Sequence, residues 1–171
     1  MDNVELSLPA LRYREPMLLL RNNHGRSEDV SGQSGGVFKL PLVARGAAFG
    51  DLDNDGFVDI VVHCLEGPSL VLRNQGGNGT HWLLIDTVGA VSNRDGIGAV
   101  VHLVSESGVE QYAMVKTSGS YFSASDKRVH FGLGAEKMAR LVEITWPSGI
   151  VQRVENVRAN QILTVKEPAR K

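Results

Sequence analysis

The sequence lacks the features that mark disulfide frameworks, membrane spans and nucleic-acid binders. Its 171 residues contain one cysteine, Cys64, which excludes an internal disulfide. It has no apolar run of the roughly 18 residues that a membrane helix needs, and residues 1–5 have neither the basic flank nor the apolar stretch of a signal peptide. Because 18 Lys and Arg nearly balance 19 Asp and Glu, the net charge of −1 offers no electrostatic footprint for nucleic acid. We therefore expect no nucleic-acid partner and no membrane insertion.

A sustained 3.6-residue apolar period is also missing, so long helices are not expected. Short runs of β-branched and apolar residues instead alternate with clusters of Gly, Asn, Asp and Ser, a pattern typical of strands and turns. One short helical turn is expected near Ala135 to Met138. The runs predict strands at residues 59–64, 69–72, 82–85, 99–104, 111–116, 141–146, 150–154 and 161–165. The sequence thus predicts an all-β fold with binding residues on loops at strand ends.

A short segment recurs after 52 residues. Residues 16–22 (PMLLLRN) match residues 68–74 (PSLVLRN) at five of seven positions, and Gly25 matches Gly77 at the same offset. This spacing suits β-propeller blades of about 50 residues. Two blades do not close a ring, because propellers typically need about four to eight. A chance likeness between two strand patterns is the alternative explanation.

The strongest chemical signal is the segment DLDNDGFVD at residues 51–59. A hard cation such as Ca²⁺ takes about six to eight oxygen ligands, and carboxylates on alternate residues of a tight loop converge on one point. Asp51, Asp53, Asp55 and Asp59 supply such carboxylates, and the backbone carbonyl of Phe57 is the expected ligand between the last two. We therefore predict a Ca²⁺ site formed by these residues.

The flanks of this loop indicate a turn between strands. The loop resembles the first nine positions of an EF-hand, but the twelfth position is Val62 and not the bidentate Glu. Residues 47–49 and 60–64 favour strands over helices, and Gly56 permits a sharp reversal. A solvated acidic turn is the alternative. Because four carboxylates within nine residues repel one another unless a cation neutralises them, we expect a metal that locks the turn and takes no part in catalysis.

The residues around the loop resemble a known repeat. Residues 45–60 (RGAAFGDLDNDGFVDI) resemble the FG-GAP, or VCBS, repeat of integrin-like β-propellers. In that family the acidic loop binds calcium between two strands of a blade. The resemblance implies a partial β-propeller, a calcium-binding blade region at residues 10–77.

The second half resembles the ASPIC/UnbV domain. The motifs that carry this resemblance are SNRDGIGA at 92–99, SGSY at 118–121, HFGLG at 130–134, WPSG at 146–149 and NQ at 160–161. This domain follows FG-GAP repeats in proteins similar to cartilage acidic protein and in many secreted bacterial proteins. The resemblance implies an antiparallel β-sandwich-like domain at residues 78–167 and a secreted, extracellular or periplasmic location. It also implies that the chain is the C-terminal part of a larger protein, or a reduced version of one, with open blade edges suited to self-association.

Two further sets of residues raise other functions. Ser118, Ser120, Ser123 and Ser125 with Asp126 and His130 contain the residue types of a hydrolytic triad, but no Gly-x-Ser-x-Gly elbow is present, so polar loop residues are the favoured interpretation. Tyr121, Phe122, Trp82 and Trp146 are candidates for an aromatic platform for sugars, although core packing is the simpler expectation.

These patterns predict a non-enzymatic calcium-binding module for extracellular recognition, adhesion or scaffolding. Its expected partner is a protein or a glycan. The alternatives are a carbohydrate-binding accessory module and a hydrolase.

Overall fold

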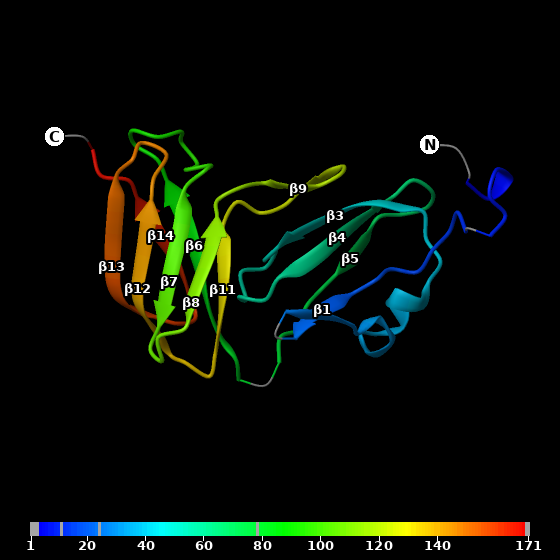
Figure 1. Cartoon of the computed structure of the whole chain (residues 1–171), viewed down its shortest axis with the longest axis horizontal. Coiled ribbons are helices and arrows are strands. Elements are labelled where there is room, and N and C mark those ends of the chain that lie inside the picture. Colours follow the sequence, from blue (N-terminus) through cyan, green and yellow to red (C-terminus); the bar gives the residue numbers. More distant parts are fainter. Residues whose placement is uncertain (1–3, 11, 24, 78, 170–171) are drawn as a thin grey trace. The chain divides into compact units, whose positions relative to one another are not determined.

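The computed structural model describes residues 4–10, 12–23, 25–77 and 79–169. Within these ranges the chain is all-β, and helical structure is confined to the short 3-10 helices η1 (Val4–Leu6), η2 (Ser31–Gln33) and η3 (Gly36–Lys39). The all-β prediction is confirmed (Figure 1). The strands are β1 Leu20–Asn23, β2 Arg26–Asp29, β3 Ala44–Gly50, β4 Asp59–Cys64, β5 Leu70–Leu72, β6 His81–Val88, β7 Val100–Ser105, β8 Glu110–Met114, β9 Ser118–Ser120, β10 Ser123–Ala124, β11 Val129–Gly134, β12 Met138–Thr145, β13 Val151–Arg158 and β14 Gln161–Lys166.

The predicted helical turn near Ala135 to Met138 is wrong. β11 ends at Gly134 and β12 begins at Met138, so three residues connect the two strands. The Glu136 N–H donates to the Leu133 carbonyl at 3.1 Å, which closes a tight turn in place of a helix. All eight predicted strands, by contrast, coincide with observed strands within a few residues.

The chain divides into two compact units, Met1–Ala47 with Val61–Val71 and Ala48–Ile60 with Leu72–Lys171. The division runs across the three-stranded sheet β3-β4-β5, so the acidic loop between β3 and β4 belongs to the same unit as strands β6 to β14. The domain boundary predicted between residues 77 and 78 stays a prediction. Asn78, where the second predicted domain starts, lies outside the described residues.

The first unit holds the antiparallel hairpin β1–β2 and the three 3-10 helices. Glu15 and Leu42 form an isolated antiparallel bridge with reciprocal backbone hydrogen bonds of 3.0 and 2.9 Å. Among the described residues of this unit, the buried apolar side chains are Phe38, Val43, Val62 and Cys64. Because these side chains are few, the unit has a small core.

The 52-residue repeat does not correspond to equivalent strands. Residues 70–72 of β5 correspond to residues 18–20 of the first copy, yet β1 begins only at Leu20. β1 pairs with β2 in a separate two-stranded sheet, whereas β5 is the neighbour of β4. A ring of four-stranded blades is not formed by the described residues, so the partial propeller stays a prediction.

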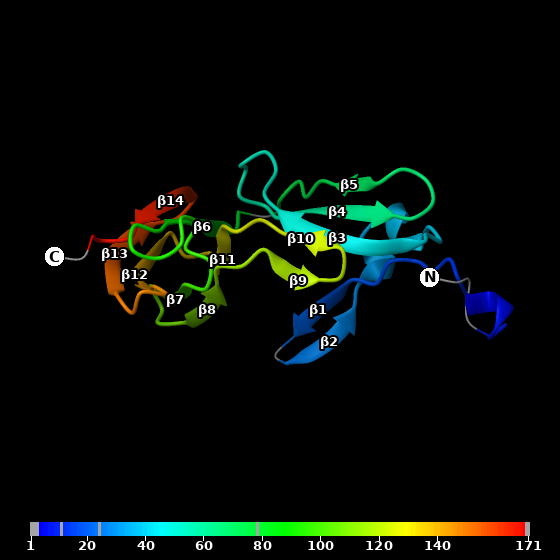
Figure 2. The ribbon, with the colours of Figure 1, turned by 90° about the horizontal axis from the view of Figure 1, so that it is seen from above.

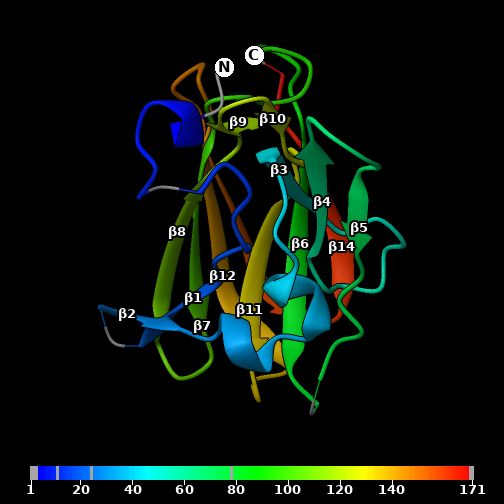
Figure 3. The same ribbon diagram turned by 90° about the vertical axis from the view of Figure 1, so that its right-hand side faces the viewer.

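Two sheets of the second unit face a common core. One has the strand order β13-β12-β7-β8, visible in Figure 1, and the other has the order β11-β6-β14, visible in Figure 3. Their buried apolar residues form a single cluster. The cluster comprises Leu83, Ile85, Ala99, Val101, Leu103, Val115, Val129, Phe131, Leu133, Ala139, Val142, Ile144, Trp146, Val157 and Val165. The unit is therefore a β-sandwich.

The expectation of a purely antiparallel sandwich needs a correction. β14 runs parallel to β6, with Gln161 opposite Leu83 and Lys166 opposite Val88. The other pairs in the two sheets, β11–β6, β12–β13, β12–β7 and β7–β8, are antiparallel. The sheet is mixed because β14 returns from the other sheet and enters beside β6 in the same direction.

Period-two alternation directs one face of each strand to the core. In β7, Val101 and Leu103 are buried, whereas His102 between them points to the other face and stacks on Tyr112 of β8. In β12 the register shifts between Ala139 and Leu141, which marks a β-bulge. The bulge keeps Ala139 in the core although it lies an odd number of residues before Val142.

β9 and β10 form a two-stranded antiparallel hairpin that leaves the sandwich between β8 and β11 (Figure 2). Its turn residues Tyr121 and Phe122 are 63% and 71% exposed. Phe122 has a φ of 51°, a left-handed conformation that is unusual for an aromatic residue. The hairpin thus presents two aromatic rings to solvent.

A single buried carboxylate ties the end of β14 to two loops. Glu167 is 2% exposed, and its Oε2 accepts hydrogen bonds from the backbone N–H groups of Ala90, Val91 and Ser92 at 2.8, 2.7 and 2.6 Å. Its Oε1 accepts from the hydroxyls of Ser92 and Ser148 at 2.8 and 2.5 Å. Burial opposes ionisation, but these hydrogen bonds outweigh it and lower the pKa of Glu167 to about 2.

We expect Glu167→Gln to lower the melting temperature by several degrees at pH 7, because five donors would face an amide in place of a carboxylate. Thermal melts of the full chain measure this loss. The exposed Glu155 on β13 is the matched control, and Glu155→Gln should melt like the wild type. A wild-type melting temperature for Glu167→Gln would contradict the structural role of this carboxylate.

The wild type and Glu167→Gln should also differ in how their stability depends on pH. The pKa of Glu167 is about 2 in the folded chain, below its ordinary value of 4.5. Its contribution to stability is therefore complete above about pH 4.5 and is lost as the pH falls towards 2. The difference in melting temperature between the wild type and Glu167→Gln should shrink over this window.

Candidate functional site

The acidic loop connects β3, which ends at Gly50, to β4, which begins at Asp59. This confirms that the loop links two strands and is not an EF-hand. Its two terminal carboxylates are buried, since Asp51 is 3% exposed and Asp59 is 2% exposed. Asp53 and Asn54, in the middle of the loop, are exposed. The loop therefore has two buried acidic ends and an accessible tip.

The buried carboxylates hold the loop backbone in place. Asp51 accepts hydrogen bonds from the Asp55 N–H at 3.1 Å and the Gly56 N–H at 2.9 Å. Asp59 accepts from the Leu52 N–H at 3.1 Å and the Asn74 N–H at 2.8 Å. These bonds partly compensate the cost of burying the two charges.

Three of the four predicted acidic ligands converge. Asp51, Asp53 and Asp59 each offer a carboxylate oxygen within 4.8 Å of the other two. Asp55 turns to the local backbone, where its Oδ1 accepts from the Phe57 N–H at 2.9 Å. The backbone carbonyl of Phe57 and the carboxylate of Asp55 stay predicted ligands.

The chemistry of these carboxylate oxygens fits Ca²⁺. The converging atoms are all carboxylate oxygens, which are the ligands that hard cations prefer. A guanidinium already interacts with the accessible side of the group, because Arg73 forms an ion pair with Asp53 and lies 3.8 Å from Asp55. The loop thus attracts positive charge, and Asp51, Asp53 and Asp59 would hold the ion.

Gly56 brings the loop into direct contact with β6. Gly56 is buried and has a φ of 91°. A Cβ at this position would lie 1.7 Å from the Trp82 ring, so the indole occupies the space that any other residue would fill. On the next segment, the ring of Phe57 similarly packs on Gly76, where a Cβ would lie 2.4 Å from it. Glycine is required at Gly56 for both conformation and space.

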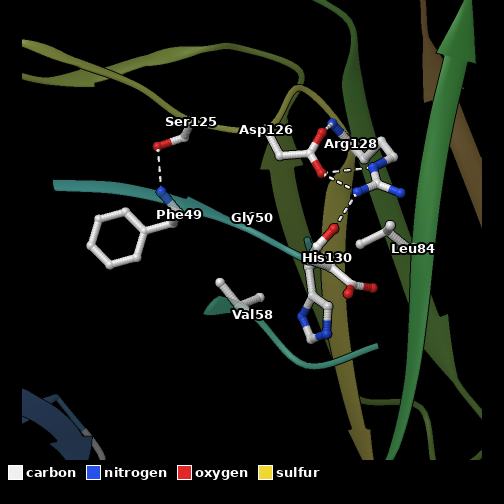
Figure 4. A pocket seen from close by; sticks show the side chains of 9 residues that line it. Phe49, Gly50, Val58, Leu84, Ser125, Asp126, Arg128 and His130 are labelled. Atoms are coloured by element: carbon white, nitrogen blue, oxygen red, sulfur yellow. Dashed lines mark hydrogen bonds and ion pairs between the residues drawn. The ribbon is translucent and has the colours of Figure 1, made fainter. Parts of the chain in front are cut away.

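A polar contact joins the loop to the residues around β11. Arg128 donates from Nη2 to the Asp51 carbonyl at 2.7 Å and from Nη1 to Asn54 Oδ1 at 2.6 Å. Asp126 holds the same guanidinium, since its Oδ2 accepts from Arg128 Nε at 2.6 Å (Figure 4). This hydrogen bond raises the pKa of Arg128 above its ordinary value, although burial opposes the rise. His130 adds a contact of 2.8 Å between its Nε2 and the Gly56 carbonyl.

A pocket of about 150 Å³ lies beside the loop, and three of the residues considered for a hydrolytic triad line it. Phe49, Val58 and Leu84 form its apolar wall, whereas Ser125, Asp126, Arg128 and His130 form its polar side (Figure 4). The Ser125 Oγ accepts from the Phe49 N–H at 3.2 Å, Asp126 pairs with Arg128, and His130 contacts Gly56. These three residues are thus bonded to groups other than one another. Ser118, Ser120 and Ser123 lie in the β9–β10 hairpin.

The four aromatic residues considered for a sugar platform are not gathered on one face. Trp146 is buried in the sandwich core, and Trp82 packs on Gly56. Tyr121 and Phe122 are exposed, with ring centroids 4.4 Å apart and planes at 74°. The core expectation therefore holds for Trp146, and the exposed pair has an edge-to-face geometry.

The contacts that seat the loop were not predicted from the sequence. Arg128 is 77 residues from Asp51, and Trp82 is 26 residues from Gly56, so no local spacing connects them. Asn54 does carry a local signal, because Asn tolerates a left-handed φ and is a common turn residue. The sequence indicates Asp126 and His130 only as residue types of a hydrolytic triad, not as contacts of the loop.

Comparison with known proteins supports the resemblance of the second half of the chain to the ASPIC/UnbV domain. Residues 89–171 match the family model described as ASPIC and UnbV. The chain is also similar to cartilage acidic protein 1 of Xenopus tropicalis, with 26% identity over 131 residues. That alignment covers 72% of this chain and 20% of the relative, so it spans about a fifth of the relative's length. The acidic loop lies outside the residues matched by the family model, and the FG-GAP resemblance stays a prediction.

The described residues contain no helix with the length and apolar character to cross a membrane.

We expect Gly56→Ala to destabilise the chain more than an ordinary glycine substitution. The left-handed φ alone costs about 1–2 kcal/mol for an L-residue, and the overlap with Trp82 adds about 1–3 kcal/mol. Gly108→Ala is the matched control, because Gly108 has a φ of 89° but open space around its Cβ position. Urea unfolding measures both free energies. Equal losses for the two variants would show that the Trp82 contact is unimportant.

Proposed function

We propose that this chain is a non-enzymatic calcium-binding module that acts outside the cytoplasm in recognition, adhesion or scaffolding. The observation that carries the calcium part is the convergence of Asp51, Asp53 and Asp59 within 4.8 Å. Like charges at this separation repel, and two of the three groups are buried, so a divalent cation stabilises the arrangement.

The metal has a structural role in this proposal. The proposed ligands lie on both sides of the turn, with Asp51 directly after β3 and Asp59 at the first position of β4. An ion bound to both therefore fixes the ends of the two strands relative to each other. The FG-GAP-like blade region at residues 10–77 is part of the same proposal, as is self-association through an open sheet edge.

The extracellular or periplasmic location and the absence of catalysis rest on different observations. The match of residues 89–171 to the ASPIC and UnbV model supports the location, because the resemblance implies an exported protein. For catalysis, the hydrogen bonds of Ser125, Asp126 and His130 described above leave no nucleophile in contact with a base among them. This favours binding over hydrolysis.

The recognition part centres on the tip of the β9–β10 hairpin. Exposed Tyr and Phe side chains are enriched in protein interfaces, because they bury large areas and lose little rotamer entropy. Tyr121 and Phe122 have this character. A protein ligand is the first candidate. A glycan is the second, because the exposed faces of these two rings are the type of surface on which sugars stack.

Calcium should raise the melting temperature of the full chain. At a Ca²⁺ concentration 100 times the dissociation constant, binding to the folded state adds about 2.7 kcal/mol, which corresponds to several degrees. The measurement is a thermal melt in EDTA, in millimolar Ca²⁺ and in millimolar Mg²⁺. Asp53→Asn should lose the calcium response and melt in EDTA at a similar or higher temperature, because one of the repelling charges is removed. Glu155→Gln should respond like the wild type, and an unchanged response of Asp53→Asn would place the ion elsewhere.

The two classes of ligand differ in a direct test. We expect a glycan array probed with the wild type in Ca²⁺ to give no signal that depends on the hairpin tip. The double variant Tyr121→Ala, Phe122→Ala is the control, and its melting temperature should match the wild type because both side chains are exposed. A glycan signal that this variant loses would replace the protein ligand with a sugar.

A further inference from the structure

The guanidinium of Arg128 contacts the acidic loop without hydrogen bonding to the carboxylates that are the proposed calcium ligands. Its two loop contacts are the backbone carbonyl of Asp51 and the side-chain amide oxygen of Asn54, at 2.7 and 2.6 Å. The carboxylates of Asp51, Asp53 and Asp59 accept none of its hydrogen bonds. Arg128 therefore orients the loop backbone and leaves the proposed ligand oxygens available.

These contacts lie at the point where the backbone of the loop reverses direction. Asn54 has a φ of 61°, and it separates Asp53 from Asp55. Its amide oxygen and the Asp51 carbonyl are fixed by one planar, forked group, which restrains residues 51–54 as a unit. Asp126 fixes the fork in turn through a hydrogen bond of 2.6 Å from Nε. A restrained loop spends less free energy on ordering when it binds an ion.

The rest of the loop rests on the same sheet. His130 in β11 contacts the Gly56 carbonyl at 2.8 Å, and the Trp82 ring in β6 lies against Gly56. Arg128 directly precedes β11. All of these residues belong to the same compact unit as the loop. Residues 51–56 thus pack against two adjacent strands of the sandwich, β6 and β11.

We propose that Arg128 is a positioning residue for calcium, so that the sandwich sheet sets the affinity of the loop through it. This inference rests on the proposed calcium function. In this proposal the loop and the sandwich bind calcium together, although Arg128 and Asp51 lie 77 positions apart in the sequence.

A second arginine provides the contrast that tests this role. Arg73 forms its ion pair with the Asp53 carboxylate itself and lies 3.8 Å from Asp55, so it competes with a cation for the same oxygens. Electrostatics alone predicts that removing either arginine strengthens calcium binding, because a positive charge near the ion is lost. A positioning role predicts opposite effects for the two.

The experiment is isothermal titration of Ca²⁺ into the full chain, compared among three methionine variants that keep an unbranched, flexible side chain but remove the guanidinium. We expect Arg128→Met to weaken binding by about tenfold or more, the usual effect of losing a group that holds metal ligands in place. Arg73→Met should strengthen binding by about two- to fivefold, because the exposed ion pair it breaks is weak. Arg153→Met removes the arginine of an ion pair with Glu143 on the far sheet and should bind like the wild type.

Tryptophan fluorescence gives a second readout where the loop packs against β6. The chain has two tryptophans, of which Trp146 is buried in the core and Trp82 touches the loop at Gly56. Calcium should therefore change the emission of the wild type, and Trp82→Phe should lose this change. Arg128→Met should shift the midpoint of the change to higher Ca²⁺.

The outcomes separate the two proposals. If the wild type binds Ca²⁺ and Arg128→Met binds equally well or more tightly, the positioning role is wrong and the calcium function stands. If the wild type binds no Ca²⁺, the calcium function fails and the positioning role fails with it. A melt in EDTA checks that Arg128→Met is folded. If it is not, Arg128→Lys takes its place, because lysine keeps the charge but lacks the fork, and wild-type affinity in that variant also overturns the role.

Discussion

The second unit depends on one continuous apolar interface between two sheets. Buried residues of β6, β11 and β14 meet those of β7, β12 and β13 in a single cluster, and such an interior excludes polar groups that lack partners. Charged side chains therefore enter at the ends of the strands. Glu167 directly follows β14, and Arg128 directly precedes β11. Both polar features discussed above lie one residue outside a core strand.

The molecule compensates buried negative charge in two ways. Glu167 is a solitary carboxylate, and donors from two loops satisfy it completely. Asp51 and Asp59 each accept two backbone hydrogen bonds, yet they share a small space with Asp53. Neutral donors reduce the cost of burying each charge but not the repulsion among three of them. The first arrangement is self-sufficient, and the second would gain from the proposed cation.

Local patterns predicted eight of the strands and the acidic loop, whereas the strands of the two short hairpins and the long-range contacts escaped prediction. The strand at 59–64 and the Asp-rich turn before it are encoded within a few residues, by β-branched runs and by Asp, Asn and Gly. The parallel entry of β14 beside β6 has no local signal, because antiparallel and parallel strands carry the same alternation here. The roles of Arg128 and Trp82 depend on tertiary contacts in the same way. The helical turn near Ala135 failed because three connecting residues leave room for a turn alone.

The parallel pairing of β14 with β6 also determines the order in which this unit is completed during synthesis. Gln161 is the partner of Leu83, so the edge of β6 stays unpaired while nearly 80 further residues are made. Pairings of such high sequence separation close late, because the loop entropy must be lost before the contact is gained. Until β14 arrives, β6 presents an open edge beside Trp82. The nascent chain therefore carries an unpaired strand edge, which is a surface open to non-native strand pairing until β14 is made.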